Sequence, residues 1–213
     1  MVVDYAELGT EDVDRIFHAL ADRTRRDIIT RAMGADHSVS SLADHYTVPS
    51  GSMQPTVQIG DRVLVSKAAY GVRLPLSDGY LVRGDEPQRG DVVVLEAPDT
   101  GIVLLKRVIA LPGDRVEVRG GQVLIDGKPS DVHVEGSVEL EQLEGGRVHT
   151  VALGDGGPDY GPVAVPSDRY LVLGDNRGNS RDGRFFGLVR RDALLGRVNG
   201  VYFRDGSFHW IAL

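Results

Sequence analysis

Residues 104–109 of the chain read Leu104-Leu105-Lys106-Arg107-Val108-Ile109, an apolar run with two adjacent cations at its centre. Successive side chains of a β-strand point to opposite faces. On that period Lys106 shares one face with Leu104 and Val108, and Arg107 lies on the other. If the Lys106 face points inward, we expect a buried amine at position 106 and a solvated guanidinium at position 107.

Further strands are predicted on both sides of this run. Short apolar or alternating segments occur at Val63/Val65, Val92 to Leu95, Val116/Val118, Val123 to Ile125, Tyr170 to Leu173 and Val198 to Phe203. Turn signals lie between many of them, at Gly120-Gly121, Asp126-Gly127, Asp155-Gly156-Gly157 and Asp205-Gly206. Many short strands with close turns indicate an antiparallel β barrel or sandwich. The acidic, glycine-broken stretch after Ser130 predicts a small β insertion at about 120–165.

The first part of the chain has a different period. In residues 1–47, Val13, Ile16, Phe17 and Leu20 follow helical spacing, and Ser40 is a candidate cap for a helix from Ser41 to His45. We therefore expect a short α-helical segment at 1–47, followed by a mainly β domain at 48–213.

Composition excludes several classes of protein. The 213 residues are 41% hydrophobic and 26% charged, which is ordinary for a soluble globular protein. The formal net charge of −7 makes nucleic acid an unlikely partner. With no cysteine, disulfides and thiolate metal sites are excluded, and we expect neither a metal nor a cofactor. We find no apolar run of about 18–20 residues and no signal peptide, so we expect a soluble chain.

Two hydroxyls stand one glycine apart at Ser50-Gly51-Ser52. A serine attacks a carbonyl only when a base takes its proton, and the six histidines form no recognisable triad. A lysine can be that base if burial lowers its pKa from about 10.4 to near neutrality. Ser52 and Lys106 are therefore candidates for nucleophile and base. The simpler alternative is a strand-edge lysine and a plain turn, and spacing alone favours it.

A third motif changes this balance. Residues 174–184 form a polar, glycine-containing loop directly after an apolar strand, which by itself indicates only a solvated loop. Taken in order, the motifs at residues 49–56, 106–114 and 174–184 resemble those of bacterial type I signal peptidases. The resemblance covers about 48–213.

The resemblance implies a serine protease with a Ser/Lys dyad, in which Ser52 is the nucleophile and Lys106 the general base. The Ser50 hydroxyl and the Ser52 backbone N–H then match an oxyanion hole. Ser180 matches the serine that orients the lysine amine by a hydrogen bond. The other matched positions are the bracing ion pair Asp182 and Arg184, the loop residues Asp175 and Asn176, and the substrate-pocket residues Val48, Pro49, Met53, Val57 and Leu105.

Members of this family remove signal peptides from exported preproteins after small residues, in an Ala-x-Ala pattern. The resemblance thus implies signal peptides as partners, bound as an added β-strand, and an active site at the outer face of the plasma membrane. Two features depart from the family. Gly183 stands where a serine is usual, which we expect to loosen the loop, and no transmembrane helix precedes the serine motif.

Residues 1–47 resemble the start of an arsenic-repressor-type winged helix-turn-helix, but the recognition helix and wing do not follow. We therefore expect no DNA binding. Two alternatives to a signal peptidase stay open on the sequence. One is a helix-turn-helix regulator with a Ser/Lys self-cleavage domain, and the other is a catalytically silent interaction module.

Overall fold

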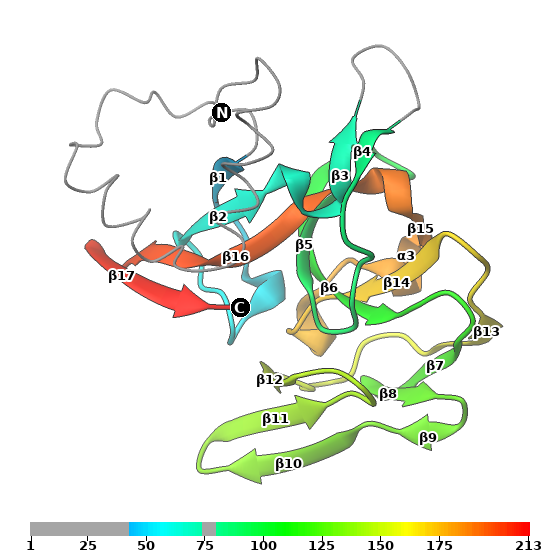
Figure 1. The fold of residues 1–213 in the computed structure, drawn as a ribbon. Coiled ribbons are helices and arrows are strands. Elements are labelled where there is room, and N and C mark those ends of the chain that lie inside the picture. Colours follow the sequence, from blue (N-terminus) through cyan, green and yellow to red (C-terminus); the bar gives the residue numbers. More distant parts are fainter. Residues whose placement is uncertain (1–42, 74–79) are drawn as a thin grey trace.

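The computed structural model describes residues 43–73 and 80–213, which fold into β-sheets joined by short helical turns (Figure 1). All named strand pairs are antiparallel, so the predicted mainly antiparallel β fold is confirmed. The largest sheet has eight strands in the order β1-β2-β16-β5-β6-β14-β15, with β17 paired to β16. These strands are β1 Ala43–Thr47, β2 Arg62–Ser66, β5 Val92–Glu96, β6 Val103–Ala110, β14 Arg169–Leu173, β15 Val189–Arg190, β16 Leu194–Arg204 and β17 Ser207–Ala212.

Smaller sheets are inserted between β6 and β14, and in Figure 1 they lie below the large sheet. One has the order β13-β7-β8-β9 and the other the order β10-β11-β12. Their strands are β7 Arg115–Arg119, β8 Gln122–Ile125, β9 Lys128–Pro129, β10 Asp131–Glu135, β11 Val138–Gln142, β12 Val148–Val151 and β13 Tyr160–Ala164. A separate hairpin joins β3 Gly71–Arg73 to β4 Tyr80–Arg83.

Over residues 43–73 and 80–213, the helical elements are single turns. They are η3 Gly51–Met53, η4 Lys67–Tyr70, η5 Arg177–Asn179, α3 Gly183–Phe186 and η6 Arg191–Ala193. No helix within the described ranges is long and apolar enough to span a bilayer.

Strand β5 is buried on both faces, which explains why its sequence is continuously apolar rather than alternating. Val92 and Val94 pack in one cluster with Met53, whereas Val93 and Leu95 pack in another on the opposite face. The four β5 residues are at most 2% exposed. The large sheet is therefore covered on both faces near the serine loop. This packing holds in place the strands that support the site.

Two predicted turns have the backbone that tight hairpins need. Asp126-Gly127 joins β8 to β9 with φ values of 52° and 78°, and Asp205-Gly206 joins β16 to β17 with 52° and 76°. Positive φ at both central residues matches the twist of the flanking strands. Asp and Gly are suited to that region because both tolerate left-handed backbone.

One helix prediction is wrong. Ala43–Thr47 forms β1 and pairs with β2 from Ala43↔Ser66 to Thr47↔Arg62, so the helix expected from Ser41 to His45 does not exist over residues 43–45. Pairing with a neighbouring strand overrides a weak local preference, and Tyr46 gains apolar contacts with the core. The other helices expected in 1–47, and most of the helix-turn-helix resemblance, fall outside the described residues and stay predictions.

Candidate active site

Ser52 lies in η3, on the loop that leads from β1 to β2. Two apolar side chains hold this loop to the core, because Met53 is 1% exposed and Val57 is fully buried. The turn is closed by a hydrogen bond from Val57 N to Met53 O at 2.9 Å. The serine itself keeps partial access to solvent. This arrangement presents the hydroxyl on a fixed backbone at the surface of the sheet.

Strand β6 delivers Lys106 to the same place. Its Nζ lies 2.7 Å from Ser52 Oγ and donates to Leu105 O at 2.8 Å. The lysine is only 2% exposed. In the part of the chain that the structure describes, no carboxylate forms an ion pair with its amine. The structure therefore brings together the two residues that the sequence nominated as nucleophile and base.

Burial gives Lys106 the protonation behaviour that a base needs. Loss of hydration lowers the pKa of its amine to about 8, and the charges of Asp182 and Asp175 oppose that change. An amine with this pKa is neutral in a useful fraction of molecules near neutral pH. A neutral amine at 2.7 Å can accept the proton of Ser52.

Arg107 differs from its prediction. It is 4% exposed rather than solvated, and it forms a bidentate ion pair with the fully buried Asp175, with Nε 2.8 Å from Oδ1 and Nη2 2.7 Å from Oδ2. Burial alone would raise the pKa of Asp175, but the Arg107 guanidinium outweighs it and lowers that pKa. Both faces of β6 are thus covered, so strand alternation could not separate a buried from an exposed cation.

The Ser50 hydroxyl lies 3.4 Å from Ser52 Oγ, on the exposed side of the loop. This places a donor beside the nucleophile, where the predicted oxyanion hole needs one. Asn176 supports the same loop from behind, because its backbone N donates to Ser52 O at 3.1 Å and its Nδ2 donates to Gly51 O at 3.3 Å.

Asp182 and Arg184 form a buried ion pair below the dyad, with Arg184 Nε 2.8 Å from Asp182 Oδ1. Asp182 also accepts from its own helix at Arg184 N and from Gly174 N at 3.0 Å. One carboxylate therefore fixes both ends of the loop between β14 and α3, in the bracing position that the sequence predicted.

Ser180 does not form its predicted hydrogen bond with Lys106. Its buried hydroxyl has no hydrogen-bond partner among the described residues, because the amine is directed to Ser52 and to the Leu105 carbonyl. Ser180 nevertheless lies in the same corner as the nucleophile. A Cβ added to Gly174 would lie 2.2 Å from Ser180 Oγ and 2.4 Å from Ser52 O.

The five residues predicted to form a substrate pocket separate into two groups. Val48, Met53 and Val57 belong to the core cluster and are at most 5% exposed, so they support the loop rather than line an open pocket. Pro49 is exposed and Leu105 is half-buried, and both have surface that a peptide can reach.

Sequence reasoning missed several members of this site. Gly174 lies in the motif at 174–184, which assigns it no role, although it allows the Ser52 and Ser180 chains to approach. Thr56 lies in the motif at 49–56, and its Oγ1 donates to Asp175 Oδ2 at 2.5 Å. The sequence signal for Thr56 is its position in that motif. Its partner, Asp175, is 119 residues further along the chain, so no local pattern links the two.

Comparison with known proteins places the chain in a family. The profile described as "Signal peptidase, peptidase S26" matches residues 27–203. The chain belongs to this family. It is 37% identical over 163 residues to "Probable signal peptidase I-2" of Synechocystis, with 74% of this chain and 62% of that protein covered. It is 35% identical over 190 residues to "Signal peptidase I" of Pseudomonas fluorescens, with 76% and 66% covered. "Signal peptidase I" of Pseudomonas aeruginosa is 37% identical over 178 residues, with 75% and 61% covered.

The chain thus spans a little over three-fifths of the length of these curated relatives.

Proposed function

We propose that this member of the signal peptidase family is a serine endopeptidase of signal peptidase I type. Its substrates are the signal peptides of exported preproteins, cut after small residues in an Ala-x-Ala pattern. The 2.7 Å contact between Ser52 Oγ and the buried amine of Lys106 carries the proposal. Family membership supports the choice of substrate, because the matched relatives are named signal peptidases.

In the proposed reaction Ser52 Oγ attacks the scissile carbonyl carbon while the neutral Lys106 amine takes the hydroxyl proton. The resulting oxyanion accepts hydrogen bonds from the Ser52 backbone N–H and the Ser50 hydroxyl. Lys106 then returns the proton to the leaving amine, and the C–N bond breaks to give an acyl-enzyme. Water attacks that ester, again losing its proton to Lys106, and Ser52 is regenerated as the acid product leaves.

Signal peptides enter a membrane during export, so the proposal includes action at the outer face of the plasma membrane. We propose that the substrate binds as an extended strand beside β6 and the serine loop, where Pro49 and Leu105 offer accessible apolar surface.

The test is cleavage of a synthetic peptide that ends its signal region in Ala-x-Ala, followed by mass spectrometry. We expect the unmodified protein to cut after the second alanine, and Ser52→Ala or Lys106→Met to reduce kcat/KM by at least about 10³-fold. Ser167→Ala, which changes a serine in the turn before β14, is the matched control and should keep full activity. If wild type and the two dyad variants behave alike, the assignment fails.

A further inference from the structure

The three-stranded sheet β10-β11-β12 contributes no member of the dyad. Its last strand, β12, nevertheless ends beside the loop that lies behind the dyad. Ala152, the residue after β12, forms a parallel bridge with Asn176. Ala152 N donates to Asp175 O at 2.9 Å, and Arg177 N donates to Ala152 O at 2.8 Å. Since Asn176 N donates to Ser52 O, the short segment 175–177 joins the inserted sheet directly to the nucleophile's residue.

A hydroxyl pair makes a second connection from β12 to the serine loop. Thr56 Oγ1 lies 2.8 Å from Thr150 Oγ1 and donates to Asp175 Oδ2 at 2.5 Å. A hydroxyl has a single proton. With Thr56 donating to the carboxylate, Thr150 is the donor to Thr56. The chain of donors therefore runs from the inserted sheet through the serine loop to the buried Asp175.

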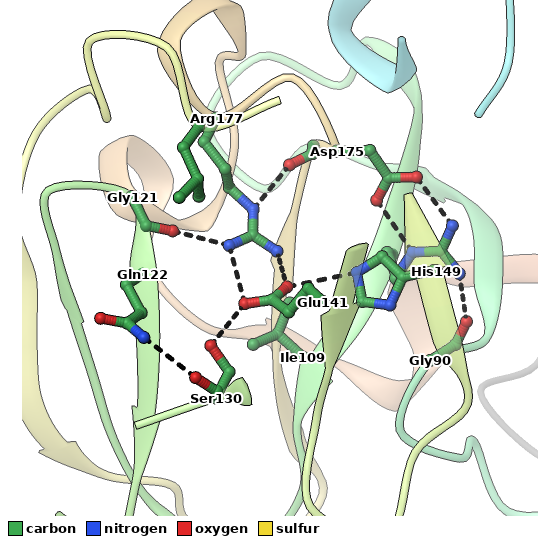
Figure 2. A network of polar contacts seen from close by, with 12 residues as sticks. Gly90, Ile109, Gly121, Gln122, Ser130, Glu141, His149, Asp175 and Arg177 are labelled. Carbon is green, nitrogen blue, oxygen red and sulfur yellow. Dashed lines mark hydrogen bonds and ion pairs between the residues drawn. The ribbon is translucent and has the colours of Figure 1, made fainter. Parts of the chain in front are cut away.

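Glu141 of β11 is the centre of the third and strongest connection (Figure 2). Its side chain is fully buried and its carboxylate accepts from Ser130 Oγ at 2.7 Å and from both terminal nitrogens of Arg177. His149 Nε2 lies 3.2 Å from the same group. Burial by itself would raise the pKa of Glu141, but the Arg177 charge and the interactions with His149 and Arg177 together outweigh it and lower that pKa to about 2. The carboxylate is therefore ionised throughout the pH range of interest.

Arg177 connects Glu141 to the active-site loop. Its Nε donates to Gly174 O at 3.1 Å, and Nη1 donates to Gly121 O at 2.6 Å. Gly174 is packed so tightly against Ser52 O and Ser180 Oγ that no side chain fits there. The Arg177 guanidinium thus holds the Gly174 peptide unit, against which the backbone of Ser52 packs.

We infer that Glu141 is a positioning residue, which through Arg177 holds residues 174–177 against Ser52 and keeps Lys106 aligned and dry. The inference rests on the proposed Ser52/Lys106 chemistry. It assigns a function to the inserted sheet, which becomes a support for the dyad. The charged groups that act on Lys106 are Asp182 and Asp175, both from this loop, but burial is the largest influence on its pKa. A loosened loop admits water, and hydration raises that pKa.

The test compares Glu141→Gln with wild type in the full chain. We expect kcat for peptide cleavage to fall about 10–100-fold while KM changes less than about 3-fold, since the loss is in alignment. An NMR titration of the ¹³Cε of Lys106 should show its pKa moving from about 8 toward the ordinary lysine value. The amides of Asn176 and Arg177 should exchange faster with deuterium. A purely structural weakening would not move the lysine titration.

The matched control is Asp114→Asn, which removes a carboxylate from an ion pair that includes none of residues 174–177. Asp114 pairs with Arg89 at 2.9 Å where β6 turns toward β7. It should reduce the free energy of unfolding without changing the Lys106 titration or kcat. Thr150→Val is a milder second variant in case Glu141→Gln does not fold. We expect it to lower kcat about 3–10-fold and to raise the Lys106 pKa in the same direction.

The outcomes separate the two proposals. A wild-type Lys106 that titrates near its ordinary pKa, in a protein that cleaves nothing, overturns the proposed function and the positioning role together. A wild-type lysine with a lowered pKa that is unchanged in both Glu141→Gln and Thr150→Val overturns the positioning role alone. Equal losses of kcat in Glu141→Gln and Asp114→Asn also overturn it.

Discussion

A buried lysine that serves as a base reduces the stability of the fold that holds it. The pKa of Lys106 is about 8 in the folded protein, below the ordinary lysine value of 10.5 that applies to the unfolded chain. Below pH 8 the amine is charged in both states, but the folded state holds the proton less favourably. The penalty is on the order of 3 kcal/mol at neutral pH and disappears as the pH rises through the unfolded value.

Replacing Lys106 by methionine should therefore stabilise the protein while abolishing activity. Methionine keeps the length and apolar contacts of the side chain but has no charge to dehydrate. We expect the free energy of unfolding at pH 7 to rise by about 1–3 kcal/mol in urea titrations. The gain should shrink at pH 10.5. The exposed Lys128 provides the control, since Lys128→Met should show no such pH dependence. A Lys106→Met variant less stable than wild type at pH 7 contradicts this account.

At the residue scale, the sequence predicts that Ser52 and Lys106 act together but does not predict their surroundings. The prediction is possible because glycine and proline frame the serine and an apolar strand surrounds the lysine. The burial of Arg107 is not predictable in this way, because its partner, Asp175, is 68 positions away. Alternation along one strand says which face a side chain takes. It does not say whether another strand covers that face.

The loop between β14 and α3 determines how closely the elements of the site approach one another. Two buried glycines, Gly174 in this loop and Gly183 at the start of α3, lie against different neighbours. A Cβ at Gly174 would lie 2.4 Å from Ser52 O, whereas a Cβ at Gly183 would lie 2.7 Å from Leu171 Cδ1 and 2.9 Å from Val172 O. The expectation that Gly183 loosens the loop is thus wrong, since this glycine packs tightly against β14.

This contrast predicts that Gly174→Ala and Gly183→Ala differ in activity. Both add one methyl group to a tightly packed position, so both should lower the free energy of unfolding by about 1–3 kcal/mol. Only Gly174→Ala displaces the nucleophile's backbone, and we expect it to reduce kcat/KM at least about 100-fold. Gly183→Ala should stay within about 3-fold of wild type, measured well below its Tm. Equal activity losses in the two variants would contradict the prediction.

At the element scale, sequence patterns predicted the strands that are apolar and missed those that are not. The apolar runs of β5, β14 and the second half of β6 are buried on both faces, and their composition alone predicts strands. Strands β10 and β13 are mostly exposed and have no continuous apolar run. β10 alternates as Asp-Val-His-Val-Glu over only five residues, and β13 contains Gly161 and Pro162. The helix predicted from Ser41 to His45 overlaps β1, which is a strand because of its pairing with β2 rather than because of its own sequence.

At the scale of the whole molecule, one buried carboxylate braces the large sheet internally and a second joins an inserted sheet to it. Asp175 pairs with Arg107 of β6, and Glu141 of β11 pairs with Arg177 behind the serine loop. Both carboxylates have pKa values below their ordinary range, because the arginine charges and the hydrogen bonds to each carboxylate together outweigh the effect of burial. A carboxylate whose folded pKa is lowered stabilises the protein above its unfolded pKa. That stabilisation is lost as the pH falls through the folded value.

The protein should therefore lose stability in acid at the junction between its sheets. For Glu141, with a pKa of about 2 against 4.5 unfolded, the contribution is on the order of 3 kcal/mol and fades from about pH 5 downward. Urea titrations of wild type between pH 7 and pH 3 should show the free energy of unfolding falling below pH 5. In Glu141→Gln, which has no proton to bind, the fall should be smaller by a measurable fraction of that contribution. Parallel pH curves for the two proteins would mean that this buried carboxylate does not contribute to the acid sensitivity of the fold.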